Sequence, residues 1–121
     1  MYYCAHAIFY FKVEQQESFL IYENIYLIEA GDEDAAMVKA QTIARDNEDL
    51  NEDGHLELNE KPAQMLFAGI RKIVAVADYS GSAEPALSCG VELTYSIMEV
   101  DTESEVEMLA KGDSVNILYR E

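Results

Sequence analysis

Strict alternation of side chains over residues 2–13 is the feature that most constrains the fold of this chain. One face of the segment collects Tyr3, Ala5, Ala7, Phe9, Phe11 and Val13, and the other collects Tyr2, Cys4, His6, Ile8, Tyr10 and Lys12. Successive side chains of a strand point to opposite faces of a sheet, so the segment predicts a half-buried strand. A polar turn at residues 14–17 and a second strand over 18–29, rich in Ile, Tyr and Phe, predict a long antiparallel hairpin.

A helix is predicted directly after this hairpin. Asp32 follows Gly31 and suits the N-cap position, and Glu33 and Asp34 place negative charge in the first turn, where the helix dipole favours it. Apolar residues recur at helical spacing, namely Ala36, Met37, Ala40, Ile43 and Ala44. We expect the helix to lie across one face of the sheet and to end in the acidic run at residues 45–53.

The second half of the chain predicts two more strands, a short helix and a last strand. Residues 64–78 and 91–100 are β-forming, and the Gly, Ser and Pro of residues 79–90 predict a loop between them. Thr102 and Glu105 match a capping box, and Gly112 ends the short helix.

Val115, Ile117 and Tyr119 predict the final strand. The order β-β-α-β-β-α-β predicts one α+β domain over residues 1–121, with a mostly antiparallel sheet of about five strands, one long helix and one short helix.

The charge of the chain limits its partners. It has 24 acidic and 8 basic side chains, a formal net charge of -16, yet half of its residues are hydrophobic, as in a folded protein. Such a surface repels nucleic-acid phosphates and anionic membranes and attracts a basic protein.

The start of the chain has no basic region typical of a secretory signal, and Cys4 and Cys89 are expected as free thiols. A cytoplasmic location is therefore expected.

Residues 49–60, D-L-N-E-D-G-H-L-E-L-N-E, have the ligand spacing of an EF-hand calcium loop. The candidate ligands are Asp49, Asn51, Asp53, the backbone carbonyl of His55, Glu57 through a water, and bidentate Glu60. The alternative is an acidic turn, in which Asp, Asn and Gly are frequent because of their turn preferences. Pro62 and the β-forming run after it favour this alternative, because an EF-hand needs a second helix there.

Polar residues inside otherwise apolar strands are candidates for a recognition patch on the uncovered face of the sheet. They are Glu23, Asn24, Arg71, Lys72, Tyr95 and Glu99. Arg and Tyr are favoured at the centres of interfaces, whereas ion pairing across neighbouring strands is the simpler alternative. Cys4, His6 and Cys89 are candidate ligands of a soft metal, but the sequence offers no fourth ligand and we interpret them as structural.

Four segments carry a family resemblance: Y-Y-C-A-H at 2–6, Y-E-N-I-Y-L-I-E-A at 22–30, F-A-G-I-R-K at 67–72 and T-Y-S-I-M-E-V-D at 94–101. Together they resemble the bacterial domain-of-unknown-function 4288 family over nearly the whole chain. Members usually begin with Trp-Tyr, and here Tyr2 replaces the tryptophan. The resemblance implies a small domain of sheet and helices and no particular activity. It also implies that residues 47–60 are a variable connection.

Three functions remain as hypotheses. The first is a non-enzymatic interaction domain that binds or inhibits a basic protein, without a cofactor. The second is a calcium-binding module built on residues 49–60. The third is an enzyme whose site is assembled from scattered residues, although no nucleophile motif, phosphate loop or zinc helix is visible in the sequence.

Overall fold

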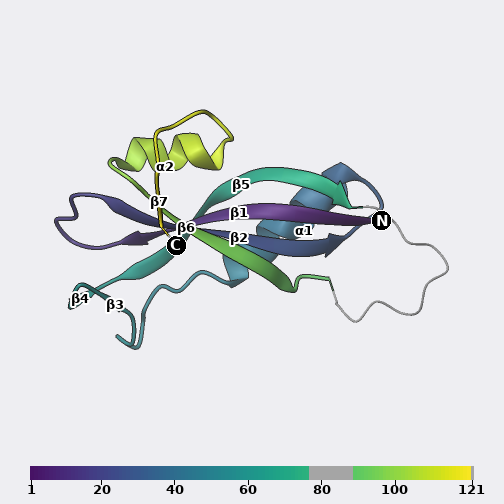
Figure 1. The fold of residues 1–121 in the computed structure, drawn as a ribbon. Coiled ribbons are helices and arrows are strands. Elements are labelled where there is room, and N and C mark those ends of the chain that lie inside the picture. Colours follow the sequence, from purple (N-terminus) through teal and green to yellow (C-terminus); the bar gives the residue numbers. More distant parts are fainter. Residues whose placement is uncertain (77–88, 121) are drawn as a thin grey trace.

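A five-stranded antiparallel sheet forms the centre of the protein. The computed structural model describes residues 1–76 and 89–120, and the strand order in its sheet is β5-β1-β2-β6-β7 (Figure 1). The strands are β1 (Tyr2–Lys12), β2 (Phe19–Glu29), β5 (Gln64–Val76), β6 (Glu92–Val100) and β7 (Leu118–Arg120). The α+β class and the antiparallel sheet predicted from the sequence are confirmed.

Helix α1 (Glu33–Asp46) covers one face of this sheet, as predicted. Its first turn is capped by the Asp32 carboxylate, which accepts a hydrogen bond of 2.8 Å from the Ala35 backbone N–H. The buried side of the helix consists of three alanines, whose small side chains let the helix lie close to the sheet. They pack in one hydrophobic cluster with the odd-numbered face of β1, and this cluster includes Ala36, Ala40, Ala44, Ala5, Ala7 and Phe9.

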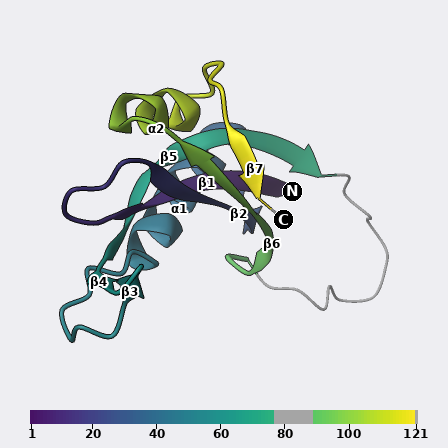
Figure 2. The same cartoon turned by 60° about the vertical axis from the view of Figure 1, so that its left-hand side comes forward.

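Helix α2 (Glu103–Ala110) packs on the opposite face of the sheet (Figure 2). Thr102 caps the helix as predicted, because the Glu105 backbone N–H donates to the Thr102 hydroxyl oxygen at 3.1 Å, and this hydroxyl donates to the Glu105 carboxylate at 3.1 Å. Val106 of the helix is fully buried in a second cluster with Ile8 and Ile21. Each face of the sheet thus has a helix, and the face expected to be uncovered is partly covered by α2.

Gly69 on β5 explains how closely α2 approaches the sheet. A Cβ atom at Gly69 would lie 3.2 Å from the Ala110 side chain, closer than an ordinary van der Waals contact. Gly112 ends the helix as predicted, with a φ of +86°, and a Cβ there would lie 3.2 Å from the Arg71 carbonyl oxygen. The end of α2 is therefore fitted to the backbone of β5.

Two local features differ from the sequence prediction. A small hairpin, β3 (Glu57–Leu58) with β4 (Lys61–Pro62), forms inside the acidic segment, where a turn alone was expected. Its turn residues Asn59 and Glu60 both have positive φ, 54° and 67°. Such strands are too short to leave a periodic pattern in the sequence.

The last strand is also shorter than predicted, because pairing begins only at Leu118. Val115 packs instead against the cluster beneath α2, and Ile117 is 43% exposed. Residues 79–88 of the loop predicted at 79–90, and the end of the predicted strand at residues 77–78, lie outside the described residues. No helix in the described part of the chain is long and apolar enough to cross a membrane.

Candidate functional site

The segment with calcium-loop spacing is held by hydrogen bonds of its own. Asp49 exchanges two backbone hydrogen bonds with Met65, of 2.9 and 2.8 Å, so its backbone is fixed beside the start of β5. The Asn51 side chain bridges the loop, because its amide donates to the Leu56 carbonyl and its oxygen accepts from the Leu56 N–H, both at 2.8 Å. The Asn51 oxygen is thus already bonded within the loop.

The His55 side chain lies between two of the candidate carboxylate ligands. Its Nε2 atom is 2.7 Å from Asp49 Oδ2, and its Nδ1 atom contacts the Asp53 carboxylate. Hydrogen bonds to Asp53 and Asp49 raise the pKa of His55, and the bond to His55 lowers the pKa of Asp53. The His55 ring therefore occupies the space between two carboxylates that a bound cation would need as ligands.

The other two candidate ligands lie on the β3–β4 hairpin. Glu57 is an exposed residue of β3, and Glu60 is in the two-residue turn with its φ at 67°. An EF-hand instead continues into a helix that holds its last carboxylate against the ion. Among residues 1–76 and 89–120, no group of three or more His, Cys, Asp or Glu side chains is arranged to hold a metal ion.

The residues of the recognition patch are divided between the two faces of the sheet. Glu23, Arg71 and Lys72 lie on the face that carries α2. Arg71 and Lys72 share this face although they are neighbours, because the register of β1 and β5 shifts at this point and leaves Arg71 as an extra residue.

Asn24 and Tyr95 pair across β2 and β6 and lie on the α1 face. Asn24 is buried, and its amide nitrogen lies 3.5 Å from the Tyr26 hydroxyl. Tyr95 is 54% exposed and stacks on Tyr22 with ring centroids 5.8 Å apart. Glu99, also on this face, accepts a hydrogen bond from the Ser18 hydroxyl.

A buried ion pair joins β2 and β5 across the central strand β1. Arg71 Nε on β5 donates to Glu23 Oε2 on β2; Glu23 pairs in register with Ile8 of β1, and Arg71 is the extra residue of β5 opposite the step from His6 to Ala7. The side chains of Glu23 and Arg71 are 8% and 26% exposed. A carboxylate so deep in a sheet needs such a partner, because removing a charge from water is costly.

His6 completes this cluster and was not predicted to belong to it. Its Nδ1 atom is 3.8 Å from Glu23 Oε2, is buried, and has no hydrogen-bond partner within the described residues. Burial lowers the pKa of His6, and the negative charge of Glu23 opposes this shift. The register of the hairpin would have predicted this contact, because His6 and Ile8 share a face of β1 and Glu23 lies on the same face when it pairs with Ile8.

The two cysteines lie on β1 and beside the end of β2. Cys4 pairs in register with Leu27, and the exposed Cys89 sulfur accepts a hydrogen bond of 3.1 Å from the Glu29 backbone N–H. Both cysteines are free.

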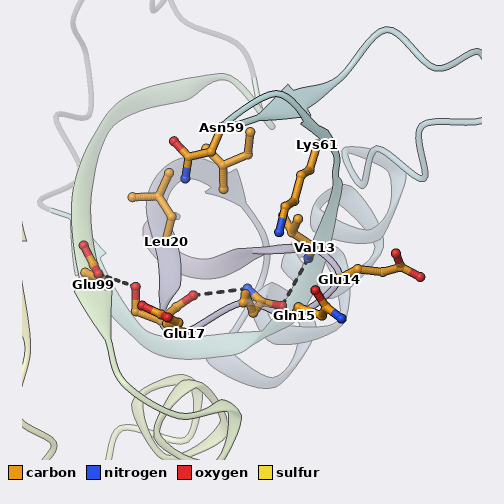
Figure 3. Close-up of a pocket in the computed structure, with 11 residues that line it drawn as sticks. Val13, Glu14, Gln15, Glu17, Leu20, Asn59, Lys61 and Glu99 are labelled. Atoms are coloured by element: carbon orange, nitrogen blue, oxygen red, sulfur yellow. Dashed lines mark hydrogen bonds between the residues drawn. The ribbon is translucent and has the colours of Figure 1, made fainter.

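A polar pocket of about 470 Å³ lies between the β1–β2 turn and the β3–β4 hairpin. Residues 13–18, Leu20, Leu58, Asn59, Lys61 and Glu99 line it. Figure 3 shows Lys61 and Leu20 directed toward the hollow and Glu14 directed away from it. Lys61 is the one cation in this lining, beside the carboxylates of Glu14, Glu17 and Glu99. The pocket is suited to polar or cationic groups.

Four basic side chains contact other groups of the protein. Arg71 pairs with Glu23, Lys12 lies 3.8 Å from Glu103, Lys39 donates to the Glu29 carbonyl at 2.7 Å, and Arg45 lies over the Phe67 ring at 5.9 Å. Residues 46–60 and 73–110 contain no Lys or Arg at all. The first of these acid-only stretches includes the β3–β4 hairpin and the second includes α2, which lie apart in Figure 1. The protein therefore presents negative charge from more than one side.

No protein-family model, curated protein or solved structure matches this chain.

Proposed function

We propose that the chain is a non-enzymatic, strongly acidic cytoplasmic interaction domain that binds, and in that way inhibits, a basic protein. The observation that carries this proposal is that the Lys and Arg side chains balance only a small part of the negative charge within the protein. Ion pairs join Arg71 with Glu23 and Lys12 with Glu103, and the 8 basic side chains of the sequence can balance only a third of its 24 acidic ones. Most of the excess of 16 negative charges is therefore available to an external partner.

The physical advantage of such a surface is speed of association. Charges of one sign on one molecule steer a partner of opposite sign into encounter and raise the association rate, by about 10- to 1,000-fold at low salt. An inhibitor of a basic toxin or nuclease gains from this because it must reach its target before the target acts. We also propose a relationship to the domain-of-unknown-function 4288 family, since its four segments lie in the neighbouring strands β1, β2, β5 and β6.

Affinity capture at low salt, followed by a salt gradient, tests the proposal. We expect the tagged protein to retain a basic protein that elutes as the salt concentration rises, because salt screens exposed charges. A variant with four exposed carboxylates made neutral, Glu14→Gln, Glu52→Gln, Glu57→Gln and Glu107→Gln, should release this partner at lower salt.

The matched control changes the same four positions to aspartate and keeps the charge. It should elute with the parent protein. A captured partner as acidic as this chain, or equal elution of the neutral and the charge-conserving variants, would contradict the proposal.

A further inference from the structure

The two edges of the sheet differ in how far they are protected against an added strand. An edge strand has unpaired backbone N–H and C=O groups, and proteins commonly block them with bulges, charges or short covering segments. On the β5 edge, Asp49 bridges to Met65, and the Glu48 carboxylate accepts from the Phe67 N–H at 2.8 Å. Two register shifts interrupt β5, and Arg71 is the extra residue at one of them. The β5 edge is therefore protected.

Within the described residues, no other segment covers the first half of the β6 edge, although one register shift, at Leu93, interrupts its pairing with β2. β7 pairs only with Ile97, Met98 and Glu99 of β6, and the residues before Ile97 have no strand partner on this side within the described chain. Figure 2 shows β7 beside one part of β6 only. Residues 93–98 carry no charged side chain. We call residues 92–96 the free section of β6.

The side chains of the free section are suited to a partner strand. Leu93 is 39% exposed and Tyr95 is 54% exposed, so both offer apolar surface. The Tyr95 ring stacks on Tyr22 and is thereby held on the α1 face. A Lys or Arg side chain placed next to such a ring is attracted to its π face.

We propose that the free section of β6 binds an extended, basic segment of the partner protein as an additional strand, an inference that rests on the proposed function. Backbone hydrogen bonds to residues 92–96 would hold the segment. Every second side chain of the segment, a Lys or Arg, would lie on the same face of the sheet as Tyr95, and one of them would lie beside its ring. Charge selects this occupant over a second copy of the chain, because a second copy brings the same net charge of -16 to the contact. The β5 edge is the poorer site, because Asp49 and Glu48 already contact it.

Two synthetic peptides of equal charge test the inference. The first alternates lysine with valine, and the second has the same sequence with N-methyl groups on alternate residues, which remove the N–H donors on one edge. We expect the parent protein to bind the first peptide at least about tenfold more tightly, because only the first can complete the strand pairing. Amide hydrogen exchange at residues 92–96 should slow when this peptide is bound.

Two protein variants locate the site. Tyr95→Lys places a positive charge in the free section and should weaken binding of the first peptide at least about tenfold. Val74→Lys is the matched control, because Val74 is also an exposed strand residue, 46% exposed, but lies on β5. It should bind the peptide within about twofold of the parent.

The outcomes separate this inference from the proposed function. Equal binding of the two peptides, or equal loss in both variants, overturns strand addition and leaves attraction by surface charge intact. Absence of binding by either peptide at low salt contradicts the proposed function as well. Slow exchange at residues 92–96 that depends on protein concentration without peptide would show a second copy at this edge and overturn the inference.

Discussion

Replacing Glu23 with glutamine should destabilise the protein, because it leaves Arg71 without its carboxylate partner. Removing one member of a buried ion pair costs about 3–5 kcal/mol when both groups are fully buried. Here the Glu23 side chain is 8% exposed but Arg71 is 26% exposed, so water can solvate part of the guanidinium group. Glutamine can also accept one neutral hydrogen bond. We therefore expect Glu23→Gln to lower the free energy of unfolding by about 2 kcal/mol.

Urea unfolding of Glu23→Gln, Arg71→Met and the double variant measures this interaction. The double variant should be less destabilised than the sum of the two single changes, by about 1–2 kcal/mol, because the orphaned charge is gone. Glu57→Gln is the control, since it removes an exposed carboxylate and should stay within about 0.5 kcal/mol of the parent. The pKa of His6 should fall further in Glu23→Gln, because Glu23 is the main group that raises it.

An effect of Glu23→Gln no larger than that of the Glu57 control, or strict additivity in the double variant, would refute the reasoning. In that case the ion pair would add nothing to the free energy of unfolding beyond what hydration of the two side chains supplies.

Three further predictions concern other parts of the molecule. Gly69→Val should lower the free energy of unfolding in urea by about 2 kcal/mol through its clash with Ala110, and Gly31→Val, where nothing lies within 4 Å, should cost less. The pKa of His55, measured by NMR, should lie above 6.5. The contacts of protonated His55 with Asp49 and Asp53 should stabilise the protein fully below pH 6.5, and this stabilisation should be lost as the pH rises through the raised pKa of His55. Calorimetry should show only weak calcium binding, at about millimolar strength, unchanged in Asp49→Ala and Glu60→Gln, whereas a micromolar site lost in both would contradict this.

The main sheet and its first helix follow from local patterns in the sequence. The alternation of residues 2–13 depends only on the geometry of a strand, and the structure buries the odd-numbered positions from Tyr3 to Phe11. Asp32 and Thr102 cap their helices as predicted, because capping is decided by a few neighbouring residues. These features need no information about distant parts of the chain.

The β3–β4 hairpin and the position of α2 were not predicted from the sequence. The β3–β4 hairpin has a turn with two positive φ values at Asn59 and Glu60, where Asn-Gly is the usual signal. The sequence also did not show that α2 covers the second face, because this depends on how Gly69 meets Ala110.

The division of the recognition patch between the two faces of the sheet could have been predicted from the sequence. Glu23 and Asn24 are neighbours in one strand, so they had to face opposite sides of the sheet, as the structure shows. The sequence groups His6 with Cys4 on one strand, and the proximity of His6 to Glu23 depends on the register of the hairpin. Ser18 and Glu99 are linked only through the pairing of β2 with β6, which are far apart in the sequence.

The most direct test of the central claim is the association rate with the captured partner at two ionic strengths. Stopped-flow mixing compares low salt, where the Debye length is about 30 Å, with physiological salt, where it is about 8 Å. If the net charge of -16 steers a basic protein to this domain, the rate should fall at least about tenfold between the two conditions. An association rate that is the same at both ionic strengths would contradict the account.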